Sequence, residues 1–129
     1  MKPNRKRLPL ALCALLLAGV AASADVDVDG DLMRGIDDTA KSLDSDVAMK
    51  DAKAAAADAR SLVETFAKVE SHYGQKQETA DAVGFAHHTQ ELAAQALKAI
   101  EANDFDAASD AVAQLTRSCR NCHEVYKKD

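Results

Sequence analysis

Aromatic residues and prolines are scarce in this chain of 129 residues. Phe and Tyr together make up 4% of it, Trp is absent, and both prolines lie within the first nine positions. Because no proline follows Pro9, no later helix is forced to break at one. No segment alternates apolar and polar residues with the period of two that marks a half-buried strand. The chain is therefore expected to be all-α, with a core that stays thin unless a cofactor fills part of it.

Cysteine is also too rare for a disulfide framework. The three cysteines are Cys13, Cys119 and Cys122. Cys13 follows Leu12 rather than a small residue, which argues against attachment of a lipid at that position. Cys119 and Cys122 belong to one short motif near the end of the chain. An exported protein would therefore not use them for disulfides that stabilise its fold.

The first 24 residues have the pattern of a signal peptide. Four basic residues among the first seven precede an apolar run at positions 8–20, and the small residues Ala22-Ser23-Ala24 follow it. This order is typical of a secretory leader with its cleavage site, and the apolar run is too short to anchor the chain in a bilayer. We expect a signal peptide over 1–24, a mature domain over 25–129 and a periplasmic location.

Negative charge dominates once the leader is removed. The mature chain keeps 12 of the 16 basic residues and all 21 acidic residues, so that its net charge changes from −5 to −9. Such an acidic surface does not suit nucleic acid, whose phosphates require Lys and Arg. It suits a protein partner with a basic docking surface.

The acidic stretch from Asp25 to Asp31 resembles the start of a calcium-binding EF-hand loop. The twelfth position of such a loop requires a Glu, and Ile36 stands there instead. We interpret the last of these acidic residues as caps of the first helix, whose positive end they would stabilise.

Four apolar stripes recur at alternating steps of three and four residues, which is the spacing of a buried helical face. A break is expected at Asp44-Ser45-Asp46, Gly74 is expected to end the second helix, Thr79 to cap the third, and Asn103-Asp104 to form the last turn. The stripes consist of Met33, Ile36, Ala40, Leu43 and Val47; of Ala48, Ala52, Ala55, Ala59, Leu62, Phe66, Val69 and Tyr73; of Ala82, Phe85, Thr89, Leu92, Ala96 and Ala99; and of Phe105, Ala108, Val112, Leu115, Cys119, Cys122 and Tyr126.

The most specific motif of the chain is Cys119-Arg120-Asn121-Cys122-His123. Two cysteines three positions apart, with a histidine directly after the second, are typical of the attachment site of a c-type haem. Each thiol forms a thioether with one vinyl group of the ring, and His123 is then placed to bind the iron. A thioredoxin-like pair would lie beside a βαβ pattern, and a structural zinc site would need further Cys or His ligands at fixed spacing. The sequence shows neither pattern.

Four helices with short connections predict an antiparallel up-down-up-down bundle. In this topology the end of the fourth helix, with the haem motif, meets the end of the second helix and the starts of the first and third. Phe66, Tyr73 and Phe85 are expected at this pole and are predicted to line the haem pocket. The opposite end of the second helix is mostly alanine.

Met33 is the candidate for the second axial ligand of the iron. It lies on the apolar stripe of the first helix at the pole of the motif, and a methionine thioether opposite His is found in electron-transfer cytochromes. The alternative role of such a methionine is to fill the core. Met49 should lie at the opposite pole, and His72 and His87 should face solvent. His88 lies one turn from both Phe85 and Leu92, at the edge of the apolar stripe, and is a marginal candidate for a ligand.

These residues carry a resemblance to a known family. A single CxxCH motif near the end of a four-helix bundle, with Met33 in the setting Asp31-Leu32-Met33-Arg34, resembles the class II c-type cytochromes, the cytochrome c′ family. The final part of the chain is also similar to soluble cytochrome b562. The resemblance implies one covalent haem c whose iron is bound by His123 and Met33. Met33 favours the methionine-ligated low-spin branch, because the high-spin members lack this residue. The short connection between the second and third helices is closer to the b-type relative.

Two functions follow from this interpretation. The first is a one-electron carrier that exchanges electrons with a redox partner protein, as a monomer or homodimer. The second is a high-spin haem protein that binds a small gas such as nitric oxide. A haem that only holds the helices together is a weaker third possibility. An enzyme is not expected, since the stripes contain no paired carboxylates, nucleophile motif or further metal cluster.

Overall fold

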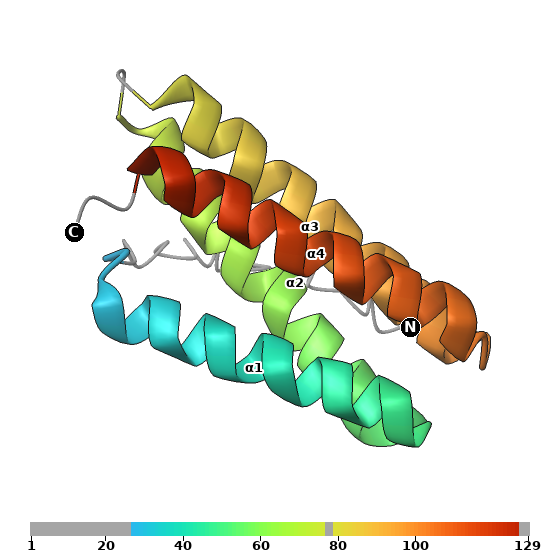
Figure 1. The fold of residues 1–129 in the computed structure, drawn as a ribbon. Coiled ribbons are helices and arrows are strands. Elements are labelled where there is room, and N and C mark those ends of the chain that lie inside the picture. The colour runs from blue at the N-terminus through green and yellow to red at the C-terminus, as the bar shows by residue number, and fades with distance from the viewer. Residues whose placement is uncertain (1–26, 77–78, 127–129) are drawn as a thin grey trace, which may run out of the picture.

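The computed structural model describes residues 27–76 and 79–126. These residues form four helices, α1 (Gly30–Met49), α2 (Ala52–Gly74), α3 (Ala80–Glu101) and α4 (Phe105–Tyr126). Successive helices run in opposite directions and lie side by side (Figure 1). The predicted all-α, antiparallel four-helix bundle is confirmed. The predicted signal peptide lies outside the described residues.

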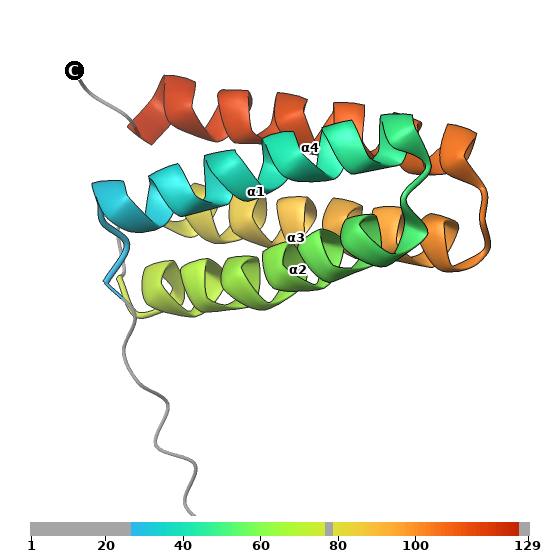
Figure 2. The same ribbon diagram turned by 90° about the horizontal axis from the view of Figure 1, so that it is seen from below.

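The four helices meet at two poles. The starts of α1 and α3 and the ends of α2 and α4 share one pole, which Figure 2 shows at the left, where the blue and dark red ends of the chain come together. We call this end the motif pole, because α4 carries Cys119 and Cys122 in its last two turns. No helix in the described part of the chain has the length and apolar character needed to cross a membrane.

Aspartate side chains begin three of the four helices. Asp29 Oδ1 accepts a hydrogen bond from the backbone N–H of Leu32 at 2.8 Å, as the sequence predicted for the acidic N-terminal stretch. Asp51 and Asp104 cap α2 and α4 in the same way, at 3.1 Å and 3.0 Å. Each carboxylate satisfies a backbone donor that has no partner within the helix and lies at the positive end of the helix dipole.

The expected break at Asp44-Ser45-Asp46 is wrong. α1 continues through these residues to Met49, and the chain turns at Lys50, which has a left-handed φ of 58°. Leu43 and Val47 are both buried, one turn apart, on either side of the polar residues. A helix keeps both apolar side chains in the core, and this outweighs the preference of Asp and Ser for a cap position.

The other predicted helix ends are close to the observed ones. Gly74 is the last residue of α2, and Asn103 turns with a left-handed φ of 56° before α4 begins. Thr79 precedes α3 as predicted, but its side chain makes no capping bond to that helix. Its hydroxyl lies 3.0 Å from the carbonyl oxygens of Tyr73 and Lys76, so that it ties the connection to the end of α2.

The core extends along the whole bundle, from Ile36 and Val69 near the motif pole to Val47 and Ile100 near the opposite pole. Alanine accounts for nine of the 19 buried apolar residues in the described ranges, which lets the helices approach closely. Bulky buried residues are found at both poles. At the motif pole Met33, Tyr73 and Phe85 are only half-buried. The largest side chains that are almost fully buried are Leu43, Leu62, Leu92, Ile100 and Leu115.

Candidate haem site

Both cysteines of the motif lie half-buried on α4, and both are free thiols. Residues three apart on a helix share a face, and Cys119 packs against the core. Burial, with Cys122 beside it, raises the pKa of the Cys119 thiol to about 11. Burial also raises the pKa of Cys122. Both thiols are therefore protonated at neutral pH in the haem-free chain.

Cys119 lies on the side of α4 that faces α1. Asp37 of α1 is near enough for its negative charge to contribute to the raised pKa of the thiol. Lys41 Nζ lies 2.5 Å from the Asp37 carboxylate and offsets part of that charge. Met33 precedes Asp37 by one turn, which places the two residues on the same side of α1. The predicted axial methionine thus lies on the helix flank beside the first cysteine of the motif.

Tyr73 is the predicted pocket residue that lies closest to the motif. Its ring centroid is 6.2 Å from that of Tyr126 on α4, and Lys76 Nζ lies 5.9 Å from the Tyr73 centroid on α2. Burial raises the pKa of Tyr73, with smaller contributions from Cys122 and Tyr126. The end of α2 therefore contributes an aromatic side chain next to the second cysteine.

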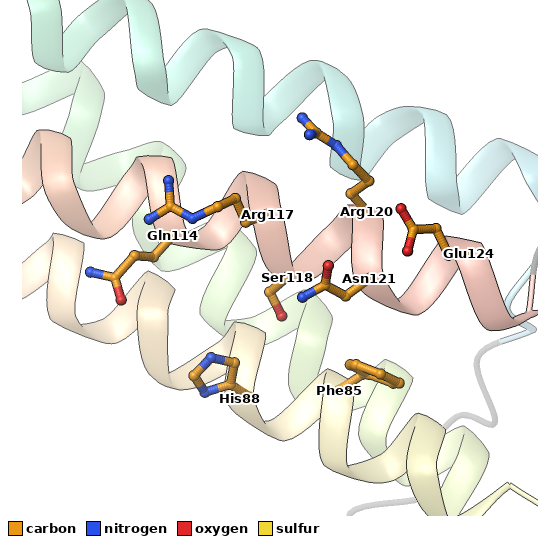
Figure 3. Close-up of a pocket in the computed structure, with 8 residues that line it drawn as sticks. All are labelled: Phe85, His88, Gln114, Arg117, Ser118, Arg120, Asn121 and Glu124. Carbon is orange, nitrogen blue, oxygen red and sulfur yellow. The ribbon is translucent and has the colours of Figure 1, made fainter.

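The other two predicted pocket residues, Phe66 and Phe85, have different surroundings. Phe66 belongs to the shared core and is 7% exposed. Phe85 lines a hollow of about 420 Å³ on the side of α4 that faces α3 (Figure 3). Arg120 and Asn121 of the motif line the same hollow, so Phe85 lies near the motif on the side of α4 that faces α3. The hollow is lined by Phe85, His88, Gln114, Arg117, Ser118, Arg120, Asn121 and Glu124.

His123 follows Cys122 directly and is exposed at the end of α4. It lies about 40° around the helix from Cys119, on the same flank, because each residue advances by about 100°. An exposed imidazole is free to turn toward a group attached to the neighbouring cysteines. His123 and Met33 thus lie at the same pole, on α4 and α1, the two helices that flank the candidate site.

The alternative ligands are less well placed. Met49 is 67% exposed at the pole opposite the motif. His72 packs edge-on against the Tyr73 ring, with centroids 5.3 Å apart. His87 Nδ1 lies 3.3 Å from a carboxylate of α2, and His88 lines the hollow between α3 and α4. Of these four residues, His88 shares its hollow with Arg120 and Asn121 of the motif, on the side of α4 that faces α3.

The residues at this pole fit a covalently attached haem. Two half-buried thiols lie one turn apart with a histidine beside them, and Leu32, Met33 and Tyr73 offer half-buried apolar surface that a flat macrocycle can cover. α1 and α4 are also the least closely packed of the four neighbouring helix pairs. In the described part of the chain, no group of three or more His, Cys, Asp or Glu side chains is arranged to hold a bare metal ion.

Sequence reasoning missed three features of this site. Asp37 is near enough to Cys119 for its charge to affect the thiol. The sequence pattern does not predict this, because a charged residue between stripe positions does not indicate which residue of another helix it approaches. Tyr126 was recognised as a stripe residue and not as a partner of Tyr73. The buried hydroxyl of Ser118 was overlooked, since a small polar residue adds nothing to an apolar pattern.

Comparison of the chain with models of known protein families, with curated proteins and with solved structures finds no match.

Proposed function

We propose that this chain is a periplasmic c-type cytochrome, similar to the class II cytochromes, that carries one electron between partner proteins. The observation that supports this most directly is the motif from Cys119 to His123, with both thiols half-buried at the end of α4. Cys119 and Cys122 would hold the ring, His123 would supply one axial ligand, and Met33 the other. When bound, the haem supplies reversible one-electron chemistry.

The residues around the motif would have specific roles in such a site. Two thioethers on consecutive turns of one helix would fix the ring against rotation. Leu32, Met33 and Tyr73 would exclude water from it, which is one of the means by which a protein sets the reduction potential of a haem. A bundle of four long helices changes little in shape, so that it would limit rearrangement when the charge on the iron changes.

Export and haem attachment are expected to occur together. The chain, expressed with its leader in a bacterium that attaches haem to exported proteins, should yield a product that begins at Asp25 and carries one covalent haem. Intact-mass measurement tests both points, and visible spectra of the oxidised and reduced protein test the ligands. Retention of residues 1–24, or a haem that is extracted by acidic organic solvent, would contradict the proposal.

The half-buried position of Met33 supports a second candidate function. A thioether that is partly reachable by solvent and borne on a flexible side chain can be displaced by a small ligand. The protein would then bind a gas such as nitric oxide at the sixth position. High-spin spectra in both redox states of the unmodified protein would favour this function over electron transfer.

Electron exchange with a basic partner is expected to be slower at high salt. The mature chain carries a net charge of −9, which would steer a basic protein toward it, and ionic strength above about 0.1 M screens such an attraction. Arg117 and Arg120 are exposed beside the motif and would reduce the effect locally. Stopped-flow rates with a small basic redox protein test this, with a neutral small-molecule reductant as the control. Equal salt dependence for both would contradict it.

A further inference from the structure

Thr89 of α3 and Ser118 of α4 are the two fully buried polar residues of the described ranges. They are 2% and 4% exposed, and their hydroxyl oxygens lie 2.6 Å apart. Thr89 Oγ1 also lies 2.7 Å from the carbonyl oxygen of Phe85. Because a hydroxyl has one hydrogen, Thr89 donates to that carbonyl and accepts the hydrogen of Ser118. Both hydroxyl groups are therefore satisfied without water.

This hydrogen bond differs from those of the other hydroxyl side chains in helices. Thr39, Thr65 and Thr116 each donate to the carbonyl oxygen four residues earlier in their own helix. Within residues 27–76 and 79–126, the Thr89–Ser118 bond is the one hydrogen bond that joins α4 to another helix. A single directional contact thus connects the helix that carries the motif to the rest of the bundle.

Because Ser118 adjoins the motif, its hydrogen bond also determines the direction in which Cys119 points. Ser118 directly precedes Cys119, and consecutive residues are turned by about 100° around a helix axis. With Ser118 held against α3, Cys119 is directed toward α1, on the side of Asp37 and Met33. A rotation of α4 by one residue position would carry Cys119 away from α1.

On the side of α4 that faces the hollow, apolar packing does not fix the rotation of the helix about its axis. Next to the hydrogen bond, α3 and α4 enclose the hollow of about 420 Å³, into which Phe85 and His88 point from α3 while Ser118 and Asn121 approach from α4 (Figure 3). The hydrophobic effect is non-directional, whereas a buried hydroxyl pair fits only one arrangement of two helices.

We propose that Thr89 and Ser118 are positioning residues, whose hydrogen bond sets the rotation of α4 so that Cys119 and His123 face α1. This inference rests on the proposed function insofar as the group presented to α1 is a haem. Neither hydroxyl touches that group. Their effect is exerted through the orientation of α4.

The test compares Thr89→Val, Ser118→Ala and the double variant with wild type. The double variant is the decisive one, because it removes the hydrogen bond without leaving an unpaired buried hydroxyl, so that its unfolding free energy should stay close to that of wild type. We expect the fraction of haem with an open sixth position, read from the ferric spectrum, to rise roughly fivefold, as the loss of one hydrogen bond allows. Thr116→Val is the matched control on α4, and its spectrum should not change.

Different outcomes separate this inference from the proposed function. If the wild-type chain carries haem and the double variant has the same spectrum as Thr116→Val, the positioning role is wrong and the cytochrome proposal stands. If the wild-type chain carries no haem, the cytochrome proposal fails, and the orientation of α4 is measured in the haem-free protein. In a Cys122→Ser background, alkylation of Cys119 should then be several-fold faster in the double variant than in Thr116→Val. Equal rates would overturn the inference.

Discussion

Replacement of both Cys119 and Cys122 by alanine is expected to yield a protein without covalent haem and with a greatly reduced free energy of unfolding. Nearly half of the buried apolar residues in the described bundle are alanines, and Leu32, Met33 and Tyr73 at the motif pole are only half-buried. Each 100 Å² of apolar surface that a haem and its surroundings remove from water contributes about 2.5 kcal/mol. Small domains have total stabilities of roughly 5 to 15 kcal/mol, so this loss is a large share of the whole.

The expected product is a compact helical chain with loosened packing at the motif pole. Far-ultraviolet circular dichroism should remain helical while the near-ultraviolet signal of the aromatic residues weakens, and urea should unfold the variant at a lower concentration. The wild-type chain produced without haem attachment is the matched control, since it lacks the ring but keeps both thiols. It should be as unstable as the double variant. Equal thermal stability of the haem-loaded and haem-free proteins would show that the ring adds nothing to folding.

The sequence predicts the fold well because each helix has its own apolar stripe. Stripe residues such as Leu43, Leu62 and Leu115 are all buried, since a helix in a bundle must cover its apolar face against its neighbours. The incorrectly predicted break at Asp44-Ser45-Asp46 shows that burial of apolar side chains can outweigh the local preference of a residue for a helix end. Asp and Ser favour cap positions, but burial of Val47 one turn beyond Leu43 stabilises the helix more than a cap would. The helix therefore ends at Met49, and the chain turns at Lys50.

The candidate site is predictable only where its residues are contiguous or lie on one stripe. The motif from Cys119 to His123 is a local pattern, and Met33 and Tyr73 follow from their stripes and the antiparallel order. A stripe tells which face of a helix is covered, but not which neighbouring helix covers each edge of that face. The hydrogen bond between Thr89 and Ser118 joins residues 29 positions apart, and no local sequence pattern predicts it.

Met33 separates the two leading functions, and its surroundings make it suitable for a test. It is half-buried on the flank of α1 that carries Asp37, which lies beside Cys119. α1 and α4 run in opposite directions (Figure 1), so that the start of one helix and the end of the other flank the same pole. A ligand from α1 would then approach the iron from the face opposite to His123. A thioether at this position raises the reduction potential and suits an electron carrier.

Met33→Ala is expected to convert a six-coordinate, low-spin protein almost completely into a high-spin one that binds carbon monoxide or nitric oxide readily. Met33→Leu should do the same, and it keeps most of the apolar volume, so that agreement between the two variants assigns the effect to the lost sulfur rather than to a cavity. Met49→Ala is the control, because Met49 is 67% exposed at the opposite pole and its replacement should leave the spectrum unchanged. Absorption spectra in both redox states and carbon monoxide titration measure these changes. If the unmodified protein is already high-spin in both states and Met33→Ala leaves its spectrum as it was, the electron-carrier proposal fails and the gas-binding function takes its place.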